Sequence, residues 1–278
     1  MTMSDKYPES SGRRRFVKGV VGSAALAGAG TAGTAVLESV TNPTGSGGGQ
    51  TNYFAVENTA GPAPRGMPMV PIEIDDNGDI KGVFPDVKEV ETETGGTKKQ
   101  ARMELGGIEY TPNWYQYCGV QGYGGLRPDY DGDNYFRFSG AGYSWQPSGG
   151  KVNIDEFDDY DTWENDYGDA GIGKPAKATW RSQNTDNTIP ILIIRSPVLE
   201  DRVESAEGEV AEWLEAATDQ GVMAIVNKCT HFCCAPQGFR TSNYEGAEDK
   251  IYCQCHQSIY DPFSIVKKSF VAFARPEN

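Results

Sequence analysis

The two histidines of this 278-residue chain most constrain what it can fold into, because each lies in a short box with cysteine. The first box is Cys229 to His231 (CTH), and the second box is Cys253 to His256 (CQCH). Thiolates and imidazoles are the side chains that bind zinc and iron centres. The two boxes therefore predict a metal or cluster site with two sulfur and two nitrogen ligands, carried on two loops.

The two boxes resemble the cluster-binding boxes of the Rieske iron-sulfur proteins. The resemblance implies a [2Fe–2S] cluster with Cys229 and Cys253 on the inner iron, and with His231 and His256 on the outer iron. Neutral imidazoles in place of two thiolates lower the negative charge of the centre, so it accepts an electron more readily. Potentials of about −150 to +300 mV result, against roughly −400 mV for plant-type ferredoxins. Such a centre suits a mild reductant, and a quinol fits that description.

Four further residues extend the resemblance. Cys234 and Cys255 occupy the positions at which one Rieske class has a disulfide between its two cluster loops. Ser258 and Tyr260 match two family hydroxyls that donate hydrogen bonds to a bridging sulfide and to a ligand thiolate, which stabilises the reduced state. The resemblance thus gives Ser258 and Tyr260 cofactor-binding roles and implies a potential at the upper end of the range.

The chain departs from the family pattern at several points. Cys233 and Gln257 stand where glycine is usual, and Gln254 stands where proline is common. The segment between the boxes is longer than usual, with a polar stretch at residues 238–249. The proline-rich third loop that follows the second box in the family is not evident. A Gly-Pro-Ala-Pro string at residues 61–64 has that composition but precedes the boxes.

The remaining cysteines leave pairing alternatives open. Cys233 is adjacent to Cys234, so either thiol is available for the disulfide, and spacing favours Cys234. We expect Cys118 to be a buried structural residue, with a disulfide to Cys233 as the alternative.

A zinc site is the alternative to an iron-sulfur cluster, because zinc binds a Cys2His2 set tetrahedrally. Zinc does not account for the cysteines at both matching offsets, so the cluster is favoured.

The N-terminal residues fit an exported and membrane-anchored protein. Residues 13–18 (RRRFVK) match a twin-arginine export signal, and an uncharged segment follows at residues 19–37. At about 1.5 Å per residue such a helix just crosses a hydrocarbon core of roughly 30 Å. We expect residues 1–40 to be a signal and membrane anchor, with cleavage as the alternative, and residues 41–60 to be a flexible tether. The head domain would lie on the extracytoplasmic side, where a disulfide is permitted.

The charge of the chain limits its partners. The 39 acidic residues outnumber the 25 basic ones, and the net charge of −14 argues against nucleic-acid binding. The acids are spread along the chain, which favours a surface that stays hydrated in concentrated salt, as in a halophilic archaeon. A Debye length of about 3 Å at 1 M salt removes most of the self-repulsion. A docking face for a basic partner is the alternative.

The pattern of apolar residues predicts a mostly β fold. By resemblance we expect a Rieske-type antiparallel β-sandwich over residues 61–278, with an irregular aromatic-rich insertion at about 107–185 and a cluster-binding subdomain at about 222–264. The strands expected lie at residues 70–74, 189–195, 222–227, 250–253 and 265–274. Residues 208–217 are the one helix expected.

The resemblance implies an electron-transfer subunit of a cytochrome bc-type quinol-oxidising complex. We expect His256 to face the quinol, with His231 exposed beside it, because a surface imidazole can accept a hydrogen bond from quinol and take its proton as the electron reaches iron. The expected partners are a cytochrome b subunit, menaquinol, and a cytochrome c or small copper protein as acceptor. The alternatives are the small subunit of an arsenite oxidase and a zinc-stabilised extracellular binding module. A Rieske oxygenase does not fit, because no further histidine remains for its mononuclear iron.

Overall fold

The computed structural model describes residues 49–61, 66–91, 96–111, 133–183, 188–231 and 233–272. All of them belong to the compact unit Pro43–Asn278. The elements in chain order are β1 (Gly49–Ala60), β2 (Gly66–Val70), β3 (Ile72–Ile74), β4 (Ile80–Gly82), β5 (Val87–Glu91), β6 (Thr97–Ala101), β7 (Met103–Leu105), β8 (Ile108–Tyr110), β9 (Arg137–Phe138), the 3-10 helix η4 (Ile154–Phe157), β10 (Lys174–Trp180), β11 (Ile189–Arg195), α3 (Pro197–Ser205), α4 (Gly208–Ala217), β12 (Val222–Val226), β13 (Ile251–Cys253) and β14 (Ser258–Ala272).

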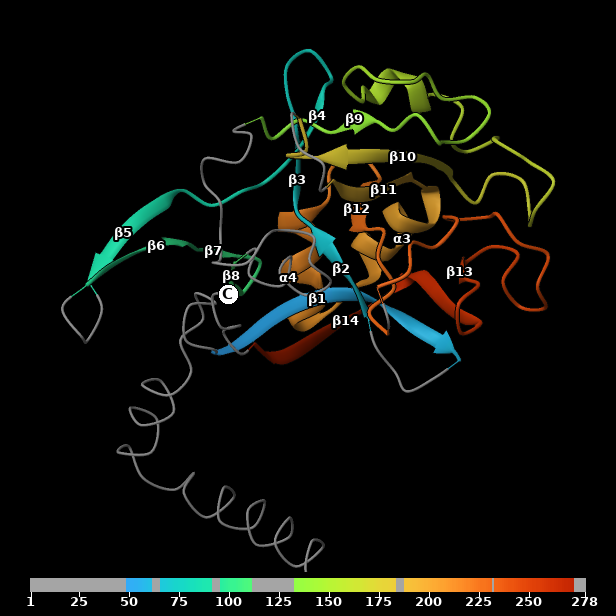
Figure 1. The fold of residues 1–278 in the computed structure, drawn as a ribbon. Helices are drawn as coiled ribbons and strands as arrows, with labels where there is room; N and C mark the ends of the chain where they lie inside the picture. The colour runs from blue at the N-terminus through green and yellow to red at the C-terminus, as the bar shows by residue number, and fades with distance from the viewer. Residues whose placement is uncertain are drawn as a thin grey trace, which may run out of the picture. The chain divides into compact units, whose positions relative to one another are not determined.

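An eight-stranded antiparallel sheet forms the frame of the fold, in the order β13-β14-β1-β2-β12-β11-β10-β9 (Figure 1). β2 joins the two halves of this sheet, because residues 66–68 pair with β1 whereas residues 69–70 pair with β12. Three two-stranded sheets, β3-β4, β5-β6 and β7-β8, complete the strands described. The expected mostly β class is therefore confirmed.

Two apolar clusters lie against the central strands, one on each face. Alternate residues of a strand point to opposite faces. Leu192 of β11 belongs to the cluster that contains Trp213 of α4, whereas its neighbour Ile193 belongs to the cluster that contains Phe157. Burial on both faces explains why β11 is apolar along nearly its whole length. The strand expected at residues 189–195 is confirmed with the same bounds.

The helices are partly those that the sequence predicts. α4 has the bounds expected from its apolar spacing and buries Trp213 and Leu214. α3 was not expected, because Leu199 is its one buried residue and its apolar pattern is weak. The signals that the sequence does carry are at its start, where Ser196 is the N-cap and Pro197 is the first helical residue.

Replacing Ser196 by Ala is expected to lower the free energy of unfolding by about 2 kcal/mol. The buried Ser196 hydroxyl accepts a hydrogen bond from the Val198 N–H at 3.1 Å and donates one to the Ile172 carbonyl. Alanine leaves both groups without this partner. Urea unfolding measures the change, with Ser205→Ala at the exposed end of α3 as the control. Equal stabilities of the two variants would contradict the capping role.

The tether expected at residues 41–60 is wrong for its second half. Residues 49–60 form β1, which pairs with β14 from Gly49 opposite Ala272 to Ala60 opposite Ile259. The physical reason is that the glycine-rich composition ends near residue 50, whereas Phe54, Ala55 and Val56 are apolar and buried. Residues 41–48 lie outside the described residues.

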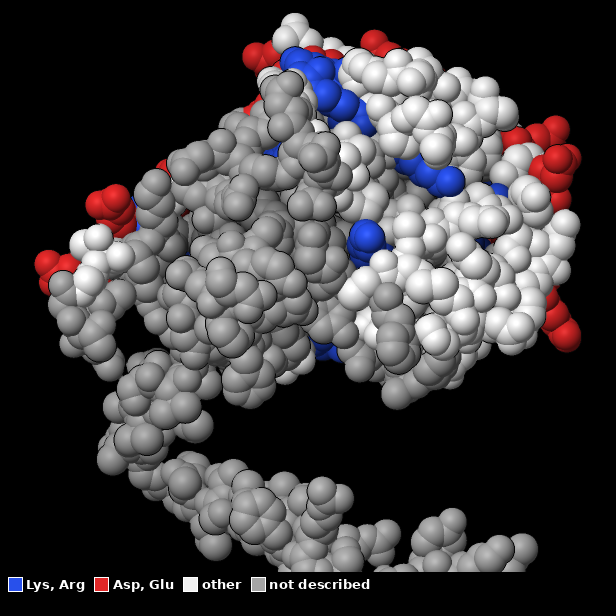
Figure 2. All heavy atoms as spheres, viewed as in Figure 1, with Lys and Arg blue, Asp and Glu red and all other residues white. Residues whose placement is uncertain are grey.

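Other expectations meet the structure in part. Within the described residues no helix is long and apolar enough to cross a membrane, and the anchor expected at residues 1–40 lies outside them. The aromatic-rich insertion expected at about 107–185 is described at residues 107–111 and 133–183, where β8 belongs to a two-stranded sheet and β10 is a regular strand of the main sheet. On the face shown in Figure 2, acidic side chains lie mainly near the edge of the described surface, and several basic side chains lie nearer its middle.

Candidate metal centre

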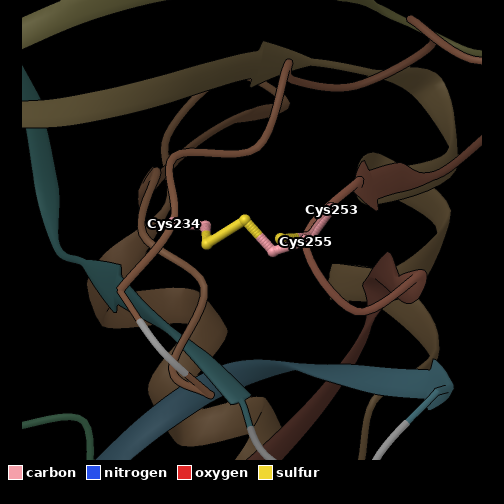
Figure 3. Close-up of side chains that lie close together, drawn as sticks. All are labelled: Cys234, Cys253 and Cys255. Atoms are coloured by element: carbon pink, nitrogen blue, oxygen red, sulfur yellow. A yellow bond between two sulfur atoms is a disulfide. The ribbon is translucent and has the colours of Figure 1, made fainter.

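Two loops at one end of the sheet carry the boxes. The first loop, described at residues 227–231 and 233–238, follows β12, and the second loop, residues 254–257, is the turn that follows Cys253 at the end of β13 and leads into β14. A disulfide joins Cys234 of the first loop to Cys255 of the second, with Cα atoms 6.6 Å apart (Figure 3). This is the pair that the resemblance implies. The crosslink holds the two boxes together although they lie far apart in the sequence.

Backbone hydrogen bonds within the first loop fix the position of Cys229. The Cys229 N–H donates to the Cys234 carbonyl at 2.7 Å, and the Cys233 N–H donates to the Cys229 carbonyl at 2.8 Å. These backbone bonds place Cys229 next to the crosslinked Cys234. The position of Cys229 is thus fixed by the same loop that carries the disulfide.

The expected sulfur ligands are buried free thiols. Cys229 and Cys253 are free and have no exposed surface, and their side chains contact each other. The sulfur of Cys253 also lies within 4.8 Å of the sulfurs of Cys234 and Cys255 (Figure 3). Because those two share a disulfide, Cys253 is the member of this group that has a thiol to offer a metal.

The thiol of Cys253 keeps its proton at neutral pH when no metal is bound. Burial raises its pKa to about 11, and the neighbouring Cys229 also raises it. The backbone N–H groups of Cys255 and His256 act in the opposite direction, because they donate hydrogen bonds to the sulfur. A metal must displace this proton to bind, so the affinity of the site for metal is expected to fall as the pH falls.

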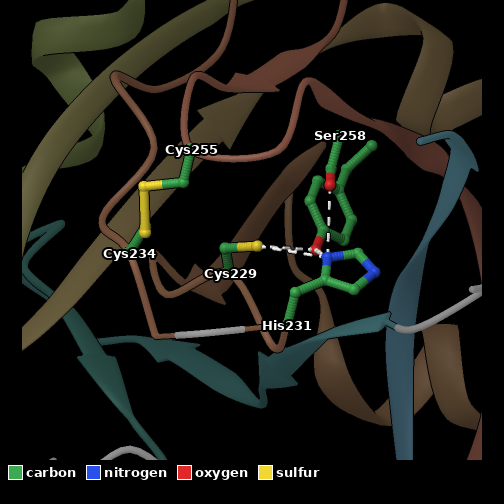
Figure 4. The surroundings of a disulfide bond; sticks show 6 residues. Cys229, His231, Cys234, Cys255 and Ser258 are labelled. Atoms are coloured by element: carbon green, nitrogen blue, oxygen red, sulfur yellow. Dashed lines mark hydrogen bonds between the residues drawn. A yellow bond between two sulfur atoms is a disulfide. The ribbon is translucent and has the colours of Figure 1, made fainter. Parts of the chain in front are cut away.

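The ring of His231 lies among the other predicted residues. Its Nδ1 atom is 3.4 Å from the Cys229 sulfur, 3.2 Å from the Ser258 hydroxyl and 3.2 Å from the Tyr260 hydroxyl (Figure 4). The structure therefore brings together Cys229, His231, Ser258 and Tyr260 from the first loop and from the start of β14.

The hydroxyl of Tyr260 is placed to donate a hydrogen bond to sulfur. It lies 3.1 Å from the Cys229 sulfur, and the whole side chain is buried. Burial, followed by the hydrogen bond to Cys229, raises the pKa of Tyr260 well above its ordinary value. The phenol therefore keeps its proton across the physiological range and can serve as a donor to a thiolate.

The two histidines are nearer to solvent than the two thiols. His231 is half-buried and His256 is exposed in the second loop, where its backbone N–H contacts Cys253. The site thus has sulfur at its base and imidazoles toward the surface. Such a gradient would shield sulfur ligands while an imidazole stayed accessible to a partner.

Cys233 and Gln257, which stand where the resemblance implies glycine, have left-handed backbone conformations. Cys233 has a φ of 63° and Gln257 has a φ of 55°, in the left-handed region that glycine adopts most readily. A residue with a Cβ is disfavoured there by roughly 1–2 kcal/mol. Both loops therefore keep a backbone conformation that suits the usual glycine. Cys233 is itself disulfide-bonded. Cys118, which the sequence offered as an alternative partner for Cys233, lies outside the described residues.

The polar stretch between the boxes packs on the second loop, which the sequence did not predict. Tyr244 stacks on Tyr252 of β13, with ring centroids 4.8 Å apart, and its hydroxyl lies 3.4 Å from the Gln257 side-chain oxygen. The stretch is therefore part of the support of the site. The one signal for this packing was an exposed aromatic residue, Tyr244, within the polar stretch.

The insertion supports the same stretch from its other side. The buried Arg240 donates a hydrogen bond to the Tyr167 carbonyl at 2.8 Å and lies 3.4 Å from the Asp249 carboxylate. The Tyr143 hydroxyl donates to the Phe239 carbonyl at 2.6 Å. Residues expected to form an irregular insertion thus fix the segment that connects the two boxes.

The donor set suits a [2Fe–2S] cluster. Two neighbouring buried thiols and two imidazoles nearer the surface match a centre that has sulfur ligands on one iron and nitrogen ligands on the other. Cys229 and Cys253 would be the sulfur ligands of such a centre, and His231 and His256 would be the nitrogen ligands.

Zinc is the second group that the donors fit. Sulfur and nitrogen on one tetrahedral zinc are about 3.6 Å apart, as follows from the usual bond lengths. The 3.4 Å between the Cys229 sulfur and the His231 Nδ1 atom is close to that value.

Comparison of the chain with protein-family models, curated proteins and solved structures finds no match. The function is therefore argued from the arrangement of the two loops.

Proposed function

We propose that the chain is a Rieske-type electron-transfer subunit that takes an electron from a quinol and passes it to a cytochrome c or small copper protein in a respiratory chain. Cys229 and Cys253 would hold one iron of a [2Fe–2S] cluster, and His231 and His256 the other. When bound, the cluster would supply one-electron chemistry. The observation that carries the proposal is that a disulfide joins the two loops, so that the two boxes of cysteine and histidine lie next to each other.

The second observation concerns the hydroxyl groups at the site. Ser258 and Tyr260 are buried, and both hydroxyls lie within 3.2 Å of His231. A structural metal site has no need of two buried hydroxyl donors beside its ligands, whereas a redox centre is tuned by such donors. This arrangement favours the electron-transfer function over a zinc-stabilised binding module.

The exposure of the two histidines supports a role for His256 in binding the quinol. His256 is exposed, so its imidazole can accept a hydrogen bond from a quinol hydroxyl and take up the proton. Cys229 and Cys253 are buried, so water would be excluded from the sulfur ligands. The wider proposal includes a Rieske-type sandwich, an anchor at residues 1–40, a head outside the cytoplasm, and a cytochrome b subunit with menaquinol as partners.

Metal content and the spectrum of the reduced protein test the proposal. The full chain, produced in a host that assembles iron-sulfur clusters, is expected to contain about two irons and to absorb visible light. After reduction it should give the electron paramagnetic resonance signal of a mixed nitrogen and sulfur [2Fe–2S] centre. A colourless protein with one zinc per chain would instead establish the zinc-stabilised module.

Replacing Tyr260 by Phe is expected to lower the midpoint potential while the iron content stays unchanged. The phenylalanine lacks the hydroxyl that lies 3.1 Å from the Cys229 sulfur, so less electron density is withdrawn from that ligand. A redox titration followed by electron paramagnetic resonance measures the shift. Tyr252→Phe on the neighbouring β13 is the matched control. An unchanged potential in the Tyr260 variant would remove the argument from the hydroxyls.

A further inference from the structure

Gly61, which directly follows β1, lies against the start of β14. Its φ is 108°, and a Cβ built at this position would lie 2.8 Å from the Ser258 Cα, 3.1 Å from the Ser258 hydroxyl oxygen and 3.2 Å from the Gln257 carbonyl oxygen. Real Cβ atoms essentially never come closer than 3.0 Å to such atoms, so a side chain would force the Ser258 backbone to move. Only glycine fits this contact without displacement.

The end of β1 is held in place by its own bonds. Asn58 is opposite Tyr260 and Ala60 is opposite Ile259, with an irregular register between them. The Thr59 hydroxyl donates to the Ile259 carbonyl at 3.4 Å, and the buried Asn58 amide donates to the Ala60 carbonyl at 2.7 Å. Gly61 therefore reaches the second loop on a fixed strand and not by chance proximity.

Ser258 lies between Gly61 on one side and His231 on the other. Its side chain has no exposed surface, and its hydroxyl is 3.2 Å from the His231 Nδ1 atom. If a side chain at residue 61 displaced Ser258 by a few tenths of an ångström, the hydrogen bond between Ser258 and His231 would change. Hydrogen-bond strength depends steeply on such distances and angles.

We propose that Gly61 is a positioning residue for the centre, because its missing side chain allows β1 to hold the Ser258 hydroxyl at His231. The effect on the redox potential rests on the proposed function. The contact between Gly61 and Ser258 does not depend on that function, because it is made between residues of the chain itself. The N-terminal strand of the domain thus forms one wall of a site whose ligands all lie after residue 228.

The test compares Gly61→Ala with Gly150→Ala in the full chain with its cluster. Gly150 has a similar left-handed backbone, with a φ of 78°, and nothing lies within 4 Å of its would-be Cβ, so it controls for backbone strain alone. Gly61→Ala is expected to retain iron and to lower the midpoint potential, whereas Gly150→Ala leaves the potential unchanged. An unchanged potential in loaded Gly61→Ala overturns the proposal.

A double-mutant cycle shows whether Gly61 acts through Ser258. Ser258→Ala lowers the potential, and the addition of Gly61→Ala to it is expected to cause no further fall, because the hydroxyl is already absent. Fully additive shifts overturn the proposal. If Gly61→Ala does not fold, Thr59→Val loosens the same strand end by removing one hydrogen bond. It is then expected to lower the potential by less than Ser258→Ala, and an unchanged potential counts against the proposal.

A measurement on the cluster-free protein separates this inference from the proposed function. The nitrogen-15 resonance of the His231 ring reports its hydrogen bond with Ser258 directly. Gly61→Ala is expected to move this resonance in the same direction as Ser258→Ala, whereas Gly150→Ala leaves it in place. A resonance that Gly61→Ala does not move overturns the proposal. A wild-type protein that never holds a cluster refutes the function and leaves this result to stand on its own.

Discussion

Replacing Cys253 by Ser is expected to reduce the iron content of the purified protein by at least about tenfold, since even weaker perturbations around metal ligands cost 10- to 100-fold in affinity. Among the described residues, no other cysteine has a thiol that could take its place. Cys229 is itself a proposed ligand, Cys233 is disulfide-bonded, and Cys234 and Cys255 share a disulfide. A serine hydroxyl remains protonated where a thiolate is needed.

The control for this experiment is Ser258→Ala, which changes a buried residue at the other end of the same turn. It removes a hydroxyl and leaves every ligand, so it is expected to keep its iron. Circular dichroism of both variants shows that the fold is retained, and elemental analysis with the visible spectrum gives the cluster content. A Cys253→Ser protein with the iron content of the wild type would exclude this residue as a ligand.

Removing the crosslink by Cys234→Ser together with Cys255→Ser is expected to lower the free energy of unfolding by about 3 kcal/mol, from the entropy of closing a loop of this length in the unfolded chain. The two cysteines are 21 residues apart. For a domain of this size the melting temperature should fall by about 6–12 °C. The loss of the crosslink also frees the two loops from each other, so the cluster should be released faster.

Genetic removal is a cleaner test than a reducing agent, because Cys233 is disulfide-bonded as well and a reductant would attack both bonds. Urea unfolding of the double variant and of the wild type under oxidising conditions gives the difference, and the decay of visible absorption gives the rate of cluster loss. The control is Ser264→Ala, a half-buried site farther along β14. A double variant as stable as the wild type would show that the surrounding hydrogen bonds alone hold the loops.

The sequence predicts the elements whose burial follows a local pattern. β11 and α4 have the expected bounds, because one is an uninterrupted apolar run and the other has apolar residues at helical spacing. Likewise, the ligands of the candidate site occur as short boxes, so their residue types and spacing are visible without a structure. These features need only a few neighbouring residues to be recognised.

The sequence does not reveal the contacts made between distant segments. β1 pairs with β14, about 200 residues later, and nothing in either strand indicates the other as its partner. The contact of Gly61 with Ser258 follows from that pairing, so the sequence alone could not place Gly61 beside Ser258. α3 was missed for another reason, since its capping residues carry the signal and its apolar face is small.

The pairing of β1 with β14 also determines when the protein can finish folding. These strands are the first and the last of the domain among the described residues, so a nascent chain cannot form this pair until nearly all of it has left the ribosome. Contacts between such distant segments slow folding, because the long loop must close before they form. The second loop gains its neighbour Gly61 only at that stage. A shortened translation product that ends before β14 would therefore expose an unpaired strand β1 to aggregation.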